Sequence, residues 1–488
     1  MGNKVSNLSK SRLMSARQCV KRLWLEVHKP ELQVVSADTR AAFAAGHAVG
    51  EVARKIYAAP KSVLIPYEGG LQHAIRKTSR LLREHTKIPI FEATFAYGGV
   101  LVRIDALLPD GDGWRIIEVK SSTSLKDDHL FDTAVQGWVF RGLGHRATKI
   151  HLAHVDNAFV YRGDENYQGL LHEVDISAEV LQLGAEVPPL LRIARDTLAG
   201  SEPVVAVGKQ CNTPYDCPFM SYCWPKGEFP VQTLPRASRA KLGEWIRLGT
   251  TDLRELPESQ LSERQQRVQR VSRTGVAELE TGAREFALSL GYPRYYLDFE
   301  TIALPVPRWP GTRPYEVLPF QWSCHYEAQE GDVRHAEFLD LSGDAPMRLV
   351  ALSLIRVLGK SGAVLMYSTY ERVVINGLQA RFPDLAPALT AIIDRLVDLK
   401  PIAEAHYYHP GMDGSWSLKA VLPTISADNE YKELKGIQEG TQASEGYLEA
   451  IDPATPAPRK AELKQQLLDY CRIDTDALRL LVRFFASA

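Results

Sequence analysis

Three of the six cysteines lie close together, as Cys211, Cys217 and Cys223 in the stretch CNTPYDCPFMSYC, and they constrain the fold strongly. One explanation is that they are buried small hydrophobic residues. The proline, asparagine and aspartate between them are atypical of a helical or strand core. A loop wrapped around a metal accounts for them better, although the spacing is not the Cys-x₂-Cys pair of common zinc modules.

The length and charge of the chain limit the remaining possibilities. Its 488 residues exceed what one compact core usually holds, so we expect two or three domains. The formal net charge is -1, so any nucleic-acid binding must depend on local basic patches. No apolar run reaches the roughly 18 residues of a membrane span, and the polar N-terminus lacks a secretory signal. We therefore expect a cytoplasmic protein with no membrane partner.

Hydrophobic periodicity predicts two α/β units with a helical connector between them. Residues 1–225 form the first unit, 226–290 the connector, and 291–488 the second unit. Within the first unit we expect, in order, a helix at 41–57, strands at 90–108 and 114–119, a helix at 127–142 and a strand at 149–155. The second unit opens with the strand YYLDFET and ends with a helix that contains LLDYCRIDTDAL.

The first set of candidate site residues lies in the first unit. Asp105 is embedded in the apolar stretch VLVRIDALL, and Glu118 and Lys120 follow a turn, in WRIIEVKSS. Glu118 and Lys120 are two residues apart and share a strand face, and a hairpin would bring Asp105 beside them. Two carboxylates bind Mg²⁺ or Mn²⁺, and a lysine can activate water and stabilise phosphate charge. The alternative is a surface hairpin with a salt bridge.

Two helical residues extend this set. His47 lies four residues before Glu51, on the same helix face, and Gln136 lies on the later helix. The ordered set resembles the motifs of the PD-(D/E)xK nuclease superfamily, in its RecB/Cas4-like branch: His47, Asp105, Glu118, Lys120 and Gln136. The resemblance implies a restriction-endonuclease-like fold over roughly residues 10–225, with the first three residues as metal ligands and the last two as catalytic residues. It departs at Phe140, where the family has a tyrosine.

Cys19 lies near the start of the chain, in SARQCVKRLW. An N-terminal cysteine followed by a distant triplet resembles the iron–sulfur clamp of Cas4- and AddB-like nucleases, although the triplet's spacing differs. The resemblance implies that Cys19 and the triplet together bind a [4Fe–4S] cluster, with Zn²⁺ as the alternative. Such a centre would join the two ends of the nuclease domain. Cys324 and Cys471 have no other cysteines near them in the sequence, and we interpret both as ordinary core thiols.

A third set lies in the second unit. Asp298 and Glu300 are two residues apart on the strand YYLDFET, and Tyr470 and Asp474 are four apart on the terminal helix. Each pair therefore shares a face, and acids from a strand and a helix can hold two metal ions that clamp a phosphodiester. The alternative is two unrelated surface pairs. Their apolar surroundings argue against it, because burying carboxylates without a partner is costly.

This region resembles a DEDD-type 3′–5′ exonuclease with an RNase H-like fold. The resemblance covers roughly residues 291–488 and implies that Asp298, Glu300 and Asp474 bind Mg²⁺ or Mn²⁺, while Tyr470 orients the attacking water. The family has an aspartate after a middle strand, where the strand GAVLMYSTYERVVI offers Glu371 as a metal ligand; Asp398 is a second candidate. Several motifs also resemble an uncharacterised bacterial family that often joins a Cas4-like half to such an exonuclease-like half.

Two further segments suggest phosphate contacts. Arg264, Arg267, Arg270 and Arg273 recur at every third position and predict a basic stripe, with local ion pairs as the alternative. The stretch WIRLGTTDLRELPESQL faintly resembles a helix-hairpin-helix. Ser417 and Lys419 would meet a phosphate at a helix N-terminus, or would simply cap that helix.

Together these features predict a metal-dependent DNA nuclease acting on single-stranded or end-containing DNA, in repair or defence. The substrate preference, and a protein partner such as a helicase, follow from the resemblance. Two alternatives remain. One is a nucleic-acid-binding or partner-docking module with one or both sites inactive, and the other is an RNA-directed exonuclease.

Overall fold

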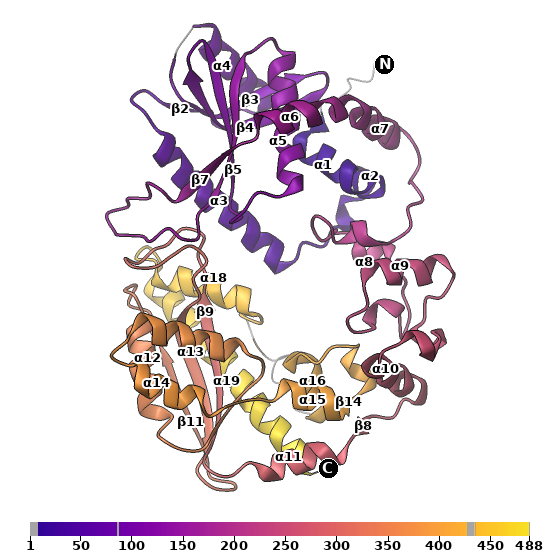
Figure 1. Cartoon of the computed structure of the whole chain (residues 1–488), viewed down its shortest axis with the longest axis vertical. Helices are drawn as coiled ribbons and strands as arrows, with labels where there is room; N and C mark the ends of the chain where they lie inside the picture. The colour runs from indigo at the N-terminus through magenta and orange to yellow at the C-terminus, as the bar shows by residue number, and fades with distance from the viewer. Residues whose placement is uncertain (1–7, 85–86, 427–433, 435, 488) are drawn as a thin grey trace. The chain divides into compact units, whose positions relative to one another are not determined.

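The computed structural model describes residues 8–84, 87–426, 434 and 436–487, and the chain forms two compact units. Unit 1 comprises Met1–Trp224 and Leu304–Tyr315, and unit 2 comprises Pro225–Ala303 and Glu316–Ala488. Both are α/β, as the sequence predicted (Figure 1). The predicted connector groups with unit 2. In the described ranges, no helix has both the length and the apolar character needed to cross a membrane.

Unit 1 is built on a seven-stranded sheet in the order β2-β3-β4-β5-β6-β7, with β1 parallel to β4. Its strands are β1 Leu8–Ser9, β2 Val63–Leu64, β3 Ile90–Tyr97, β4 Val100–Asp110, β5 Gly113–Lys120, β6 Ala147–Val155 and β7 Leu171–Asp175. The predicted strand at 90–108 is in fact two antiparallel strands. Gly98 and Gly99 adopt φ of 60° and 86° and turn the chain between them, a conformation that glycine tolerates best.

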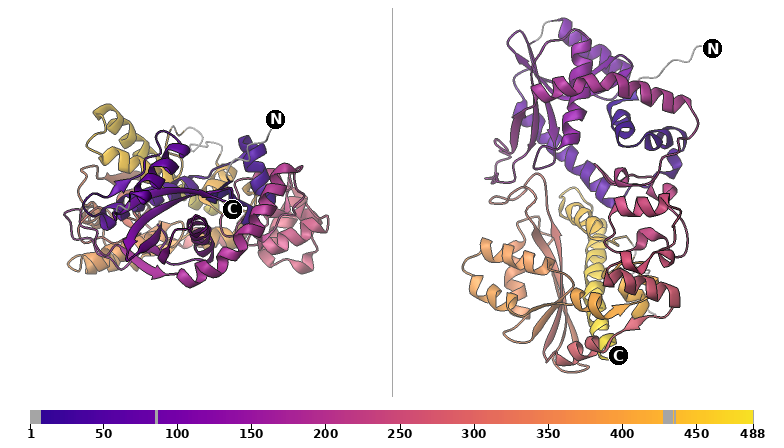
Figure 2. Two further views of the ribbon diagram at one scale, coloured as in Figure 1. Left: turned by 90° about the horizontal axis from the view of Figure 1, so that it is seen from above. Right: turned by 45° about the vertical axis from the view of Figure 1, so that its right-hand side comes forward.

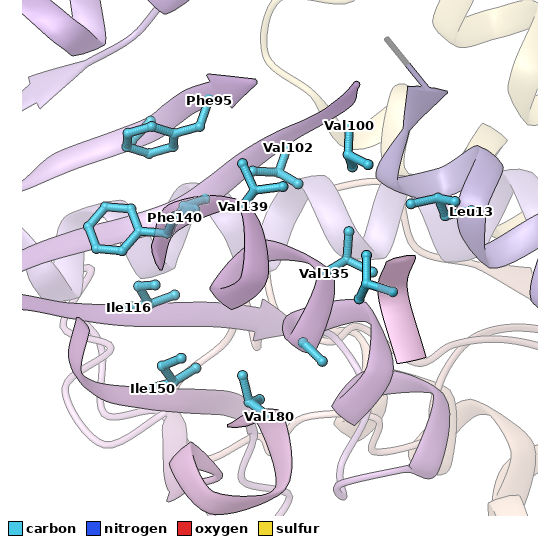
Figure 3. Close-up of a cluster of buried hydrophobic side chains, with 14 of the residues drawn as sticks. Leu13, Phe95, Val100, Val102, Ile116, Val135, Val139, Phe140, Ile150 and Val180 are labelled. Atoms are coloured by element: carbon cyan, nitrogen blue, oxygen red, sulfur yellow. The ribbon is translucent and has the colours of Figure 1, made fainter. Parts of the chain in front are cut away.

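Unit 1 also contains α-helices, several of which pack on this sheet. They are α1 Lys10–Gln18, α2 Val20–His28, α3 Ala37–Tyr57, α4 Leu71–Arg83, α5 Asp127–Gly142, α6 Ser177–Leu183, α7 Val187–Ala199 and α8 Met220–Cys223. The main core lies between the sheet and α5, where Val135, Val139 and Phe140 pack against Phe95 and Ile116 (Figure 3). Phe140 is fully buried there and is a core residue.

The segment Leu304–Tyr315 connects two strands of unit 2 but belongs to unit 1. Its Val306 and Tyr315 pack against an apolar cluster formed by α3 and β6 with Leu170. The Tyr315 hydroxyl donates to the backbone oxygen of Ser121, directly after the E-V-K motif. The core of unit 1 is therefore completed by residues distant in sequence, and Leu304–Tyr315 is part of its fold.

Replacing Tyr315 with alanine is expected to destabilise unit 1 by about 2 kcal/mol, because a half-buried ring and a hydrogen bond are lost. Hydrogen exchange of β6 amides in the full chain measures the effect. Tyr67→Ala is the matched control, since Tyr67 is 63% exposed in the same unit. Equal exchange rates in the two variants would contradict the assignment of this segment to the core of unit 1.

Unit 2 is built on a five-stranded sheet in the order β11-β10-β9-β12-β13. The five strands are β9 Arg294–Ile302, β10 Leu318–Glu327, β11 Val333–Leu339, β12 Ala363–Met366 and β13 Leu396–Asp398. β9, β10 and β11 form an antiparallel meander, while β12 runs parallel to both β9 and β13. A separate two-stranded pair is formed by β8 Glu278–Leu279 and β14 Tyr407–Tyr408.

Unit 2 contains α-helices before, between and after the strands of the five-stranded sheet. They are α9 Arg239–Arg247, α10 Glu263–Thr274, α11 Thr281–Ser289, α12 Met347–Val357, α13 Tyr370–Arg381, α14 Ala386–Ile393, α15 Lys400–His406, α16 Leu418–Ile425, α18 Gly440–Ile451 and α19 Ala457–Ala486. The long α19 packs along β9, β10 and β11, and α12 and α13 also pack on the sheet (Figure 2, right). This arrangement places the terminal helix against the strand that carries Asp298 and Glu300.

The connector differs from its sequence-based expectations. After α9, residues Leu253–Glu255 and Glu258–Gln260 form two 3₁₀ turns, so the stretch is not a helix-hairpin-helix. The four arginines of α10 are ion-paired inside unit 2 rather than forming a stripe available to phosphates. The pairs are Arg264–Glu404, Arg267–Glu280, Arg270–Glu278 and Arg273–Glu258. The local ion-pair alternative is therefore the correct one.

Candidate metal sites

Glu118 is the centre of a buried ion-pair cluster in unit 1. Its side chain is 3% exposed, and its Oε1 accepts hydrogen bonds from Nζ of Lys10 and Nζ of Lys120, both at 2.8 Å. Its Oε2 accepts from Nε2 of Gln136 on α5. Both lysines also donate to Oδ2 of Asp132, at 3.0 and 2.5 Å. The structure thus brings Glu118, Lys120 and Gln136 together and adds two residues that the sequence did not single out.

Of these two residues, Asp132 could have been predicted from the sequence, whereas Lys10 could not. Asp132 lies four residues before Gln136 on α5, so helical spacing places both on one face and could have identified it. Lys10 reaches the cluster because it starts α1 immediately after β1, which pairs with β4. No local pattern distinguishes it from other lysines near the start of the chain.

Asp105 lines a cavity of about 250 Å³ on the α3 side of the sheet. His47 and Glu51 of α3 line the same cavity, together with Glu92 of β3. Oδ2 of Asp105 accepts a 2.8 Å hydrogen bond from the backbone N of Val119, at the centre of the E-V-K motif. The helical histidine and the strand aspartate, predicted as ligands of one metal, therefore face a common space.

Glu92 is a further residue that the sequence did not reveal. Its φ is 55°, in the left-handed region that residues with side chains rarely adopt. The β3–β4 register is interrupted there, because Phe91 and Ala93 pair with β4 but Glu92 and Asp105 do not pair with each other. Strained backbone of this kind concentrates at functional sites. Glu92 thus adds a third acidic side chain, beside Asp105 and Glu51, to the lining of this cavity.

The pKa values of Asp105 and Glu118 are shifted in opposite directions. Burial, reinforced by the charge of Glu118, raises the pKa of Asp105 well above its ordinary value. Burial also opposes ionisation of Glu118, but Lys10 and Lys120 outweigh it and hold the pKa of that carboxyl well below its ordinary value. Burial thus opposes the negative charge of Asp105, whereas two ammonium groups stabilise the negative charge of Glu118.

The four cysteines of the predicted centre converge on one pocket in unit 1. Cys19 is the residue between α1 and α2, and it lines this pocket together with Cys211, Cys217 and Cys223. The first cysteine thus meets a triplet that is about 200 residues later in the sequence. Burial raises the pKa of Cys217 to about 11 and also raises that of Cys223.

The pocket is held together by polar contacts and flanked by positive charge. Nε2 of Gln18 donates to the backbone oxygens of Gln210 and Tyr215, at 2.8 and 2.6 Å, and so joins the end of α1 to the triplet loop. Lys21 and Arg22 also line the pocket. Their charges favour the thiolate forms of Cys223 and Cys217 respectively, which are the forms that bind metals.

The strongest candidate cation site lies in unit 2. Ligand atoms of Asp298, Glu300 and Cys471 all lie within 4.8 Å of one another, and this is the only such group of three or more ligand-type side chains among the described residues. His47, Asp105 and Glu118 do not meet so closely as a set. Sγ of Cys471 donates to Oδ2 of Asp298 at 3.5 Å. Cys471 and Cys324 are both fully buried, as expected of core thiols, but the contact with Asp298 also places Cys471 beside the acidic residues of unit 2.

Three other predicted residues surround this group. Glu371 lies in the first turn of α13, not on the preceding strand, because β12 ends at Met366. Its Oε2 is buried and has no hydrogen-bond partner in the described part of the chain. Asp474 makes the largest charge contribution to the raised pKa of both Asp298 and Glu300. Tyr470 is 5% exposed, and burial together with Asp474 raises its pKa.

Asp398 and Lys419, two further candidate residues from the sequence, each make a hydrogen bond to the backbone. Oδ1 of Asp398 accepts from the backbone N of Lys400, although its charge also reaches Glu371. Nζ of Lys419 donates to the backbone oxygen of Gln438 at 2.5 Å and lies 5.1 Å from the centre of the Tyr470 ring. Ser417 is the residue before α16, but its side chain makes no capping hydrogen bond. Lys419 therefore places a positive charge beside the acidic group.

Metal-free protein is expected to lose stability through Glu371 as pH rises. Burial raises the pKa of Glu371 from 4.5 to about 7. The folded state thus binds this proton more tightly than the unfolded state. This tighter proton binding contributes about 3 kcal/mol to the free energy of unfolding. The contribution is fully present below pH 4.5 and is lost as the pH rises to about 7.

Chemical denaturation in EDTA across this pH range measures the effect. The free energy of unfolding of the unsubstituted protein should fall by that amount relative to Glu371→Gln. Glu445→Gln, at an exposed position of α18, is the control and should follow the unsubstituted protein. Parallel curves for the unsubstituted protein and Glu371→Gln would contradict the buried position of this carboxyl.

Comparisons with known proteins cover part of the chain. A family described as Domain of unknown function (DUF2779) matches residues 295–417, which include Asp298, Glu300 and Glu371. No curated protein matches the chain. The chain is similar to a solved structure titled "Crystal structure of SSO0001", with 17% identity and a TM-score of 0.26, over 46% of this chain and 88% of that chain.

Proposed function

We propose that the protein is a metal-dependent nuclease that cleaves DNA. The observation that carries this proposal is the convergence in unit 2 of carboxyl groups from β9, α13 and α19. These are Asp298, Glu300, Glu371 and Asp474. Burying several acids together is costly unless cations neutralise them. Carboxylate oxygens are the ligands that Mg²⁺ and Mn²⁺ prefer.

The topology of unit 2 supports a DEDD-type 3′–5′ exonuclease domain. Its meander β11-β10-β9 continues into two strands parallel to β9, which is the arrangement of RNase H-like sheets. Since one fold can host many functions, the argument for catalysis depends on the acidic group rather than on this topology.

Each residue of the group has a part in the proposed reaction. Divalent cations bound there would lower the pKa of a water nucleophile and neutralise charge on the attacking and leaving oxygens of a phosphodiester. Asp298 and Glu300 of β9 would hold these cations together with Asp474 of α19. The raised pKa of Tyr470 keeps its hydroxyl protonated, so that it can orient the attacking water. Lys419 would attract the phosphate.

Unit 1 would supply a second site of the PD-(D/E)xK type. His47, Asp105 and Glu118 would bind the cation there, while Lys120 and Gln136 act as catalytic residues. The ammonium of Lys10, however, already bonds Glu118, so a cation must compete with an internal positive charge. This contact favours a second candidate function, in which unit 1 is inactive and binds nucleic acid or a partner protein.

The four cysteines would hold a [4Fe–4S] cluster, with Zn²⁺ as the alternative. Their thiols line one pocket, and Lys21 and Arg22 beside them would offset the negative charge of bound thiolates. In this proposal the centre is structural, because it links α1 and α2 to the loop at 211–223 and contributes folding free energy.

End-labelled substrates test the proposal with the full chain. Single-stranded DNA, duplex DNA with ends, and RNA are incubated with Mn²⁺, Mg²⁺ or EDTA. We expect metal-dependent release of nucleotides from DNA, faster from single strands than from duplex. Faster release from RNA than from DNA would favour the RNA-directed exonuclease. Binding without cleavage in either metal would favour the binding module and contradict the nuclease proposal.

Lys120→Met assigns the activity to one of the two units. In the nuclease proposal this variant loses cleavage by unit 1 and keeps nucleotide release by unit 2. Unchanged cleavage when unit 2 is also disabled would remove unit 1 from the proposal.

A further inference from the structure

Cys471 lies in the acidic group of unit 2, although thiols are not ligands that Mg²⁺ prefers. It is fully buried on α19, three residues before Asp474, and its Sγ contacts Asp298. Ligand atoms of Asp298, Glu300 and Cys471 all lie within 4.8 Å of one another. Metal–ligand bonds are about 2.0 to 2.3 Å for carboxylate oxygen and thiolate sulfur, and the three side chains form a group that could hold one metal ion.

A second observation points to a cation at the same place. Glu371 is 4% exposed, and its Oε2 has no hydrogen-bond partner within the described residues. Its carboxyl interacts with Asp398 and also with Asp298 and Asp474, so it lies beside this group. A buried oxygen without a partner is costly, and a bound cation would supply the missing partner.

We propose that Cys471 is a metal ligand and makes this site select a thiophilic divalent transition ion, of the Zn²⁺, Co²⁺ or Fe²⁺ class, over Mg²⁺. Sulfur ligands favour such ions, whereas all-oxygen sites suit Mg²⁺. On binding, the S–H bond of Cys471 breaks, its proton passes to solvent, and the sulfur lone pair forms the metal bond. The inference rests on the proposed metal site of unit 2 and goes beyond the Mg²⁺ or Mn²⁺ that carboxylates alone imply.

Co²⁺ is the probe, because a thiolate bound to Co²⁺ gives a sulfur-to-metal charge-transfer absorption. The full chain, with its four-cysteine centre loaded, is titrated with Co²⁺ and difference spectra are recorded. We expect the band in the unsubstituted protein and its loss in Cys471→Ser and Cys471→Ala. We also expect the ratio of Co²⁺ to Mg²⁺ affinity to fall at least about tenfold in both variants.

Cys324→Ser is the matched control, since Cys324 is equally buried but lies on β10 and donates to the backbone oxygen of His325. It should keep the band. Thermal unfolding shows which variants are folded, and Cys471→Ala serves where the buried serine destabilises the chain. A band and an affinity ratio that persist in a folded Cys471 variant would overturn the proposal and leave Cys471 as a hydrogen-bond donor to Asp298.

Cleavage assays on the same proteins separate this inference from the proposed function. A Cys471-dependent Co²⁺ band without cleavage of any substrate would support the metal ligand and contradict the nuclease. Full cleavage with Mg²⁺ in the unsubstituted protein and in Cys471→Ser, together with an unchanged affinity ratio, would support the nuclease and overturn the inference.

Discussion

Replacing Asp298 with asparagine is expected to lower metal-dependent release of 3′ nucleotides about 1000-fold, which corresponds to about 4 kcal/mol of transition-state stabilisation. The amide keeps the size of the side chain but removes the charge that attracts a cation. Asp298 lies within 4.8 Å of the ligand atoms of both Glu300 and Cys471, so its loss affects the centre of the group. The measurement uses 3′-labelled single-stranded DNA and a Lys120→Met background, which removes the contribution of unit 1.

A control on the terminal helix makes this test specific. Asp469 also lies on α19, but its side chain is 39% exposed and ion-pairs with Arg472 at 4.0 Å. Asp469→Asn should therefore keep the activity. If Asp298→Asn releases nucleotides as fast as this control, the carboxylates of unit 2 are not a catalytic site and the exonuclease proposal is wrong.

Replacing Cys217 with serine is expected to remove the metal centre of unit 1 and to destabilise that unit by several kcal/mol. Cys217 and Cys19 line the same pocket, so the substitution breaks the link between the start of the chain and the triplet loop. An iron–sulfur centre gives absorbance near roughly 400 nm, which should disappear together with protein-bound iron. Zinc content in place of iron would identify the alternative metal.

Cys324→Ser separates metal binding from general destabilisation. Cys324 is fully buried in unit 2, so its replacement should perturb packing while leaving the iron content unchanged. Gln18 is unchanged in both variants, so we expect its hydrogen bonds to the triplet loop to maintain some order there. Unchanged metal content in Cys217→Ser would show that these cysteines are not the ligands of such a centre.

The helices and strands that local patterns predicted mostly agree with the structure. The helix expected at 127–142 is α5 Asp127–Gly142, and the strand expected at 149–155 lies within β6. The exception at 90–108 has a physical reason, because Gly98 and Gly99 turn the chain inside a continuous apolar stretch. The helix-hairpin-helix expectation was wrong, since the residues after α9 form 3₁₀ turns instead of a second α-helix.

Some contacts among the candidate site residues could be predicted from the sequence, and others could not. Spacing correctly placed Glu118 beside Lys120, because residues two apart on a strand share a face. The same spacing could not reveal that Lys10 neutralises Glu118, or that Cys471 contacts Asp298 across 173 positions of sequence. These contacts depend on how β1 pairs with β4 and how α19 packs on β9.

The sequence by itself determined the α/β class, the approximate bounds of several helices and strands, and the residue types of three candidate sites. These properties follow from covalent geometry and from side-chain periods of two in strands and 3.6 in helices, which act over a few residues. Only the tertiary structure decided that Leu304–Tyr315 belongs to unit 1, that Glu92 adopts a strained conformation, and that a thiol joins the acids of unit 2. Such features arise because long-range packing minimises the free energy of the whole chain, and no local pattern encodes which distant side chains will meet.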